Sequence, residues 1–148
     1  MIQPRKIKLL ISVNNFAREG AGRWVLNQLN YFNKDKYEIA LLTLSEVSNK
    51  DTFFDLLPPG IKSYRLNFKN FRDVKNWFRV CKILKNYKPD VVLSQLFLSN
   101  TVLRVLKPIF NYKIIIYELN TYVNKTKLQI LIDKILSYLT YKIIAGSN

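Results

Sequence analysis

The chain has 148 residues, a formal net charge of +14, 49% hydrophobic and 23% charged residues, which indicates one globular domain with a full core. It has no histidine and one cysteine, Cys81, so an internal disulfide, a Ser-His-Asp triad and a zinc site built on imidazole are excluded. No apolar run approaches the roughly 18 residues of a membrane-spanning helix, and the start lacks a signal-peptide pattern. We therefore expect a cytoplasmic protein, or one that is peripheral on the inner face of the cytoplasmic membrane.

The first unit of the chain is a strand, a polar loop and a helix. Residues 6–13 are rich in Ile, Leu and Val, and Gly20 and Gly22 open a helix that runs to Phe32. The first amides of a helix lack partners within the helix, and its dipole favours negative charge there. Arg23 adds donors suited to phosphate or carboxylate. The segment therefore predicts an anion site, and the alternative is that the glycines only let the helix pack close to the sheet.

The middle of the chain predicts two more strands and a helix. The strands are residues 37–44 and 61–66, with one helical turn near 53–57 between them. Residues 71–87 predict a helix with two kinds of face. Its apolar face is predicted to comprise Phe71, Val74, Trp77, Phe78, Cys81 and Leu84. Its basic stripe comprises Arg72, Lys75, Arg79 and Lys82. We expect Cys81 to be a small core residue.

The last third of the chain continues the alternation. Strands are predicted at 90–94, 113–117 and 141–145, with a helix at 96–106 that Pro108 ends. Thr126 and Gln129 predict a capping box at the start of another helix. Strands that alternate with helices predict a doubly wound, Rossmann-like α/β sheet of about six parallel strands. In such a sheet ligands bind beyond the carboxyl ends of the strands, which nominates the loops 14–23, 45–48, 94–100 and 118–124.

Two common phosphate-binding motifs do not fit these loops. A dinucleotide-binding fingerprint requires a third glycine where Val25 stands, and its glycines follow the strand directly. No G-x-x-x-x-G-K-[ST] sequence occurs either, so a P-loop is excluded.

Several stretches read together resemble the N-terminal domain of family 4 glycosyltransferases, which have the GT-B fold. Residues 19–29, EGAGRWVLNQL, are similar to the family motif GGAERVVLNLA, and residues 83–94, ILKNYKPDVVLS, are similar to LLKxxKPDVVxS. IALLTL at 39–44, YELN at 117–120 and KIIAGSN at 142–148 also look like family segments. The sequence departs from the family at Glu19, at Gly22 and, where a histidine often contacts the sugar, at Leu119.

The resemblance implies the transfer of a sugar from a nucleotide-diphosphate sugar to a glycan or lipid-linked acceptor, with no cofactor and no bound metal. It covers essentially the whole chain, 1–148, and implies that the donor-binding domain is missing from this fragment or is a separate partner, so this half alone is expected to be inactive. No residue is nominated as catalytic. The residues that it nominates for substrate or phosphate binding are Gly20, Ala21, Gly22, Arg23, Asn15, Phe16, Ser94, Gln95, Glu118 and Asn120. For Glu118 and Asn120 the alternative is loop capping.

The segment 65–88 contains eight basic residues and one acid, Asp73. Lipid-linked acceptors would bring the enzyme to an anionic membrane, and we expect residues 68–88 to contact it through the basic stripe. The alternative is a core helix with a solvated lysine face. Two other classes stay open: a basic nucleic-acid-binding module, which we do not expect because no known nucleic-acid-binding motif is present, and a non-catalytic α/β binding module.

Overall fold

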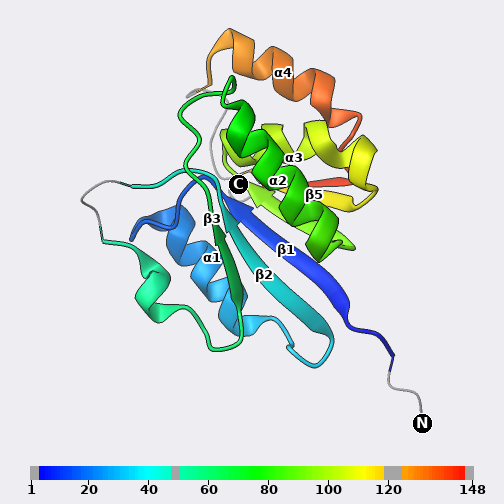
Figure 1. Cartoon of the computed structure of the whole chain (residues 1–148). Helices are drawn as coiled ribbons and strands as arrows, with labels where there is room; N and C mark the ends of the chain where they lie inside the picture. Colours follow the sequence, from blue (N-terminus) through cyan, green and yellow to red (C-terminus); the bar gives the residue numbers. More distant parts are fainter. Residues whose placement is uncertain (1–3, 48–50, 119–124, 146–148) are drawn as a thin grey trace.

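The computed structural model describes residues 4–47, 51–118 and 125–145. In this part of the chain six parallel strands form one sheet in the order β3-β2-β1-β4-β5-β6 (Figure 1), which confirms the predicted doubly wound α/β fold. The strands are β1 (Ile7–Val13), β2 (Tyr37–Thr43), β3 (Lys62–Arg65), β4 (Val91–Gln95), β5 (Lys113–Glu118) and β6 (Lys142–Ala145). The helices are α1 (Gly20–Tyr31), α2 (Val74–Tyr87), α3 (Phe97–Phe110) and α4 (Lys127–Ser137), with the 3-10 turn η1 (Phe53–Leu56).

Two apolar layers cover the two faces of the sheet because side chains alternate along each strand. Leu9, Ile11 and Val13 of β1 face α1 and η1, whereas Leu10 faces α2 and α3. Figure 1 shows α1 and α2 on opposite faces. The chain leaves β1 toward β2 and leaves β4 toward β5, so the strand order reverses between β1 and β4. The carboxyl ends of these two strands therefore border the crevice in which this class of fold binds ligands.

Helix α2 buries a face rotated from the one predicted: Trp77, Cys81 and Leu84 pack against the core as predicted, whereas Phe71, Val74 and Phe78 are exposed. Its buried residues are Asn76, Val80, Leu84 and Tyr87. Val74 and Phe78, predicted to be in the core, are 62% and 72% exposed. The helix also begins at Val74 rather than residue 71, because the Asp73 side chain accepts a hydrogen bond from the Asn76 amide and caps it there. Cys81 is half-buried against the core, and burial raises the pKa of its thiol.

Helix α3 does not end at Pro108, contrary to the prediction. It continues to Phe110, with Pro108 in its last turn. A proline there removes one backbone hydrogen bond near a terminus, and the helix stops where Asn111 adopts a left-handed conformation with φ 49°.

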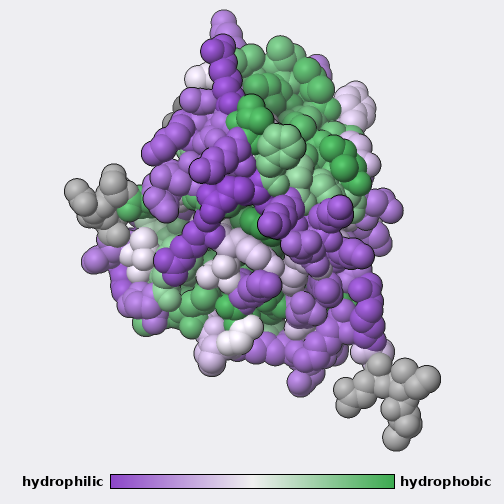
Figure 2. Space-filling model, in the orientation of Figure 1, coloured by the Kyte–Doolittle hydropathy of each residue, from purple (hydrophilic) through white to green (hydrophobic). Residues whose placement is uncertain are grey.

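Helix α4 begins at the predicted capping box, in which both the Thr126 and Gln129 side chains bond to backbone amides. No residue of α4 is fully buried, and part of its apolar surface is exposed. Leu128, Leu131 and Ile135 are exposed, and Figure 2 shows apolar side chains gathered over the end of the molecule where Figure 1 places α4. Within the described ranges, no helix is long and apolar enough to span a bilayer.

Candidate functional site

The first turn of α1 lies at the carboxyl edge of the sheet, and its two glycines play different parts. A Cβ atom on Gly22 would lie 2.0 Å from the carbonyl oxygen of Ala17 and 3.2 Å from the Phe53 ring, whereas a Cβ on Gly20 would meet nothing within 4 Å. Gly22 thus allows close packing of α1 against the loop that precedes it. No close contact explains why position 20 is a glycine, so packing does not account for both glycines. That this turn binds an anion remains a prediction.

Arg23 is exposed beside this turn. Its guanidinium carbon lies 5.4 Å from the centre of the Phe53 ring, and within the described ranges it makes no ion pair. A second arginine, Arg18, lies over the same ring but pairs with Asp55 at 2.5 Å. Arg23 is therefore the cation at the N-terminus of α1 that is available to an anionic ligand.

Ser94, at the end of β4, is occupied within the protein. Its hydroxyl lies 2.8 Å from that of Ser99, which in turn donates to Ser12 at 2.7 Å, and all three side chains are buried. The Ser99 amide donates to the Asn14 side chain at 3.0 Å. These bonds join β1, β4 and α3, so Ser94 fixes the geometry of the crevice rather than lining it.

Among the nominated residues that the structure describes, Gln95 is the one whose side chain is buried and without a hydrogen-bond partner. It is 1% exposed, and neither polar atom of its amide is bonded within the described structure. Strand alternation places the Gln95 side chain on the face of the sheet that α1 covers, and its neighbour on β5 is Tyr117. The centre of the Tyr117 ring lies 3.8 Å from the centre of the Trp24 ring in α1. The ends of β4 and β5 thus meet the beginning of α1.

The residue after Gln95 has an unusual backbone. Leu96 has φ 68° and ψ 153°, a region that residues other than glycine rarely adopt. The turn carries the chain from β4 directly into α3. Strain of this kind, at the carboxyl end of a central strand, is typical of functional sites.

Glu118, at the end of β5, belongs to a chain of charged groups. Its carboxylate lies 3.0 Å from the Lys125 ammonium, which is 2.7 Å from Asp133, and Asp133 also pairs with the buried Arg104. Burial partly desolvates Lys125, but hydrogen bonds to Asp133 and Glu118 raise its pKa. Glu118 thus ties β5 to α3 and α4, and Asn120 lies outside the described residues.

The other two nominated residues, Asn15 and Phe16, are in the loop after β1. The Asn15 side chain accepts a hydrogen bond from the Ala17 amide at 3.3 Å. Phe16 is buried, and the centre of its ring lies 5.8 Å from the centre of the Phe53 ring and 5.2 Å from that of Phe54. Asn15 therefore shapes the loop, and Phe16 supports η1.

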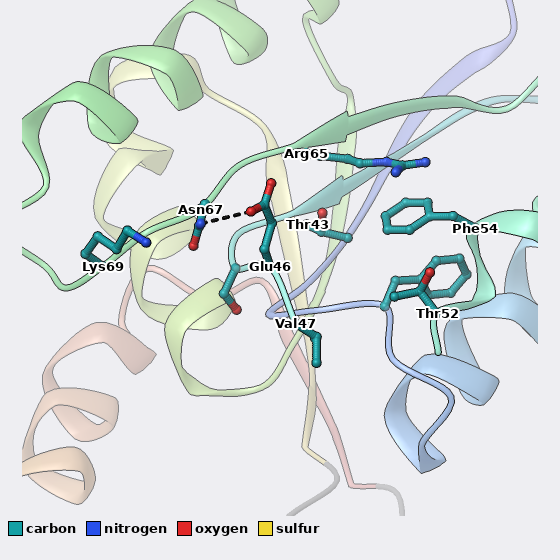
Figure 3. Close-up of a pocket in the computed structure, with 10 residues that line it drawn as sticks. Thr43, Glu46, Val47, Thr52, Phe54, Arg65, Asn67 and Lys69 are labelled. Carbon is teal, nitrogen blue, oxygen red and sulfur yellow. Dashed lines mark hydrogen bonds between the residues drawn. The ribbon is translucent and has the colours of Figure 1, made fainter. Parts of the chain in front are cut away.

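A cavity of about 370 Å³ at the carboxyl ends of β2 and β3 lies beside these rings (Figure 3). Of its lining only Phe16 was nominated individually, although the loop 45–48 was nominated as a segment. In the sequence analysis Arg65 counted only toward the basic segment 65–88, and Lys69 only toward that segment and the expected membrane contact of residues 68–88. The rule that ligands bind at the carboxyl ends of strands would have found Arg65, had the end of the edge strand β3 been included. The lining residues are Phe16, Thr43, Ser45, Glu46, Val47, Thr52, Phe54, Arg65, Asn67 and Lys69.

We compared the chain with family models, with curated proteins and with solved structures. Neither a scan against family models nor a search of curated proteins gave a match to this sequence. Solved structures do match. Sucrose-phosphate synthase from Thermosynechococcus elongatus superposes with a TM-score of 0.71 at 14% identity, over 97% of this chain and 43% of its own. MurG from Acinetobacter baumannii gives 0.67 at 11% identity, over 96% and 42%.

The chain has the fold of one half of a GT-B protein. HepE from Anabaena, solved in complex with UDP, also matches, with a TM-score of 0.68 at 13% identity over 95% of this chain and 38% of its own. This chain spans about two fifths of the length of these three proteins. The fold that the sequence resemblance implied is thereby confirmed, and at these identities the likeness concerns the fold alone.

Proposed function

We propose that this chain is the acceptor-side domain of a glycosyltransferase that moves a sugar from a nucleotide-diphosphate sugar to a glycan or lipid-linked acceptor in envelope polysaccharide synthesis. The observation that carries the proposal is the meeting of α1 with the ends of β4 and β5, marked by the contact between Trp24 and Tyr117. It gathers the free amides of α1, Arg23 and the strained β4 turn at the edge where this fold class binds ligands. The GT-B likeness, which includes a structure with bound UDP, supports it.

In this proposal the chain forms one wall of a cleft, and a second, nucleotide-binding domain forms the other. The amides of the first turn of α1, with Arg23, face the donor diphosphate or an acceptor phosphate and stabilise the negative charge that develops there. The domain alone then binds ligands weakly and turns over little or no substrate.

Titration of the ¹⁵N-labelled chain with UDP, pyrophosphate and uridine tests the anion site. We expect saturable shifts of the amide resonances of residues 20–23 with UDP and with pyrophosphate, and no such shifts with uridine, which has no phosphate. Loss of one charge-assisted contact at this exposed position in Arg23→Gln should weaken binding about three- to tenfold.

The matched control is Lys36→Gln, at an exposed lysine before β2 on the opposite edge of the sheet, which should leave the affinity unchanged. Shifts confined to residues outside 14–23 and 94–100, or identical affinities of Arg23→Gln and the unchanged protein, would contradict the proposal. Tight, salt-dependent binding of random oligonucleotides at low micromolar protein would favour the nucleic-acid alternative instead.

We also propose that α2 attaches the domain to an anionic membrane. The predicted basic stripe, Arg72, Lys75, Arg79 and Lys82, is exposed as expected. Support beyond the charge comes from Val74 and Phe78, which lie on the solvent side of α2 beside Lys75 and Lys82 instead of in the core. Exposed apolar side chains flanked by lysines are typical of helices that lie in a membrane interface.

Sedimentation with vesicles that contain anionic lipid tests this attachment. Changing the four stripe residues to Gln should abolish binding at physiological salt, because each basic residue contributes about 1 kcal/mol near such a surface. The matched control removes the same charge at the amino edge of the sheet. It changes Lys34, Lys36, Lys62 and Lys113 to Gln, all of which are exposed. Equal losses in both variants would show that net charge, rather than α2, binds the vesicles.

A further inference from the structure

The cavity at the ends of β2 and β3 is lined by Phe16 and by residues of the segments 43–47, 52–54 and 65–69. Thr43 ends β2 and Glu46 follows it, Arg65 ends β3 and Lys69 follows it, and Phe54 belongs to η1. Figure 3 shows the pair formed by Glu46 and Asn67 between Lys69 on one side and Arg65 on the other. The cavity, of about 370 Å³, is large enough for one monosaccharide with a charged substituent.

Two cations in this cavity have no carboxylate partner among the residues that the structure describes. The Arg65 guanidinium carbon lies 3.5 Å from the centre of the Phe54 ring, which orients the planar group. Neither Arg65 nor Lys69 makes an ion pair within the described ranges. By contrast, Arg18, Arg104 and Lys125 are each paired with a carboxylate.

The rest of the lining is suited to hydroxyl groups. The Asn67 side chain donates to the Glu46 carboxylate at 3.0 Å, which holds both side chains in place. The remaining oxygens of this pair can accept hydrogen bonds from a ligand, and Thr43 and Thr52 also line the cavity. One carboxylate against two cations leaves a net positive cavity that also carries oriented hydrogen-bonding groups.

The cavity adjoins the N-terminal turn of α1. Phe16, which lines it, stacks edge-on against Phe54 at 5.2 Å, and Ala17 pairs with Thr52 in an isolated bridge. Ala17 is also the residue against which Gly22 of α1 packs. Phe16 and Ala17 thus connect the wall of the cavity to the N-terminal turn of α1.

We infer that this cavity binds an acidic sugar of the acceptor, with its phosphate or carboxylate on Arg65 and its hydroxyls on Glu46, Asn67 and Thr43, while Lys69 adds attraction from the other side of the Glu46–Asn67 pair. Arg65 offers a forked pair of donors to such a group, and Lys69 offers a point charge. The inference rests on the proposed function for the role of the ligand as acceptor, but the binding site itself stands on the cavity alone.

Titration of the ¹⁵N-labelled chain with glucose 6-phosphate, glucuronate, glucose and inorganic phosphate tests the inference. We expect both acidic sugars to bind with shifts at residues 43–46, 52–54 and 65–69, and each to bind at least about tenfold more tightly than glucose or inorganic phosphate. The stronger of the two then identifies a phosphorylated or a uronic acceptor. Equal affinity for inorganic phosphate and the acidic sugars would overturn the assignment of a sugar site.

Two variants and two controls complete the test. Arg65→Gln and Lys69→Gln should each weaken binding of the acidic sugars about tenfold while the melting temperature stays the same, since both side chains are exposed. Lys62→Gln, at the start of the same strand, and Lys113→Gln, at the start of β5, should leave their affinity unchanged. Unchanged affinity in Arg65→Gln and Lys69→Gln overturns the inference. If the unchanged protein binds the acidic sugars but does not bind UDP, the proposed function is overturned and the assignment of this site stands.

Discussion

The two glycines at the start of α1 provide a direct test of what this turn is built to do. In Gly22→Ala the new methyl group would lie 2.0 Å from the Ala17 carbonyl oxygen, whereas Cβ contacts under 3.0 Å are essentially never found, so α1 or the loop must move by about 1 Å. Overpacking of this kind costs about 1–3 kcal/mol, and the better helix propensity of alanine returns at most about 1 kcal/mol.

We expect Gly22→Ala to lower the free energy of unfolding by about 1–2 kcal/mol, or Tm by about 2–8 °C for a domain of this size. Gly20→Ala is the matched control, because its Cβ would meet nothing within 4 Å, and it should be neutral or stabilising by a few tenths of a kcal/mol. Urea unfolding followed by circular dichroism measures both. Equal stabilities of the two variants would refute the packing argument for Gly22.

Three further predictions concern backbone strain, buried charge and alkaline pH. Lys88→Gly should stabilise the protein by about 0.5–1 kcal/mol in thermal melts, because Lys88 is exposed and has a left-handed backbone with φ 52°. Asn111→Gly, at φ 49°, should raise the stability less, since asparagine tolerates this conformation. Asp133→Asn should cost about 3 kcal/mol in urea unfolding, because it leaves the buried Arg104 without its carboxylate, and a cost near zero would contradict a structural role for the pair. Burial raises the pKa of the Tyr112 phenol above that of an unfolded tyrosine. The stability that the neutral phenol contributes is therefore complete below about pH 10 and is lost as the pH rises further. Tyr112→Phe should flatten the fall of the urea unfolding midpoint between about pH 9 and 11.

The elements and their order were predictable because each has a local signal. Each of these signals is formed by residues only a few positions apart in the sequence. This holds for the periodicity of a strand or helix, for the turn residues and for the capping box at Thr126. The face that α2 buries was not predictable in this way. Its sequence has two apolar flanks at helical spacing, and the one that includes Val80 and Tyr87 faces the sheet. The Tyr87 hydroxyl donates to the carbonyl oxygen of Glu38 on β2, a contact between residues far apart in the chain.

The candidate site shows the same division. Gly20, Arg23, Gln95 and Glu118 were nominated from the loops that follow strands, and the structure places them at the carboxyl edge of the sheet. Which of them are available to a ligand depended on partners that no local pattern reveals. Glu118 is engaged by Lys125, whereas Arg23 makes no ion pair in the part of the chain that the structure describes.

The amino-acid sequence by itself determined the parallel α/β sheet, because alternating strands and helices with right-handed crossovers leave few other arrangements. Only the tertiary structure decided which polar groups are occupied and where a cavity opens. Ser12 and Ser99 are 87 positions apart and yet share a hydrogen bond, and the cavity next to Arg65 and Lys69 exists only where β2, β3 and η1 meet. Such contacts follow from packing in three dimensions, which short-range sequence patterns do not encode.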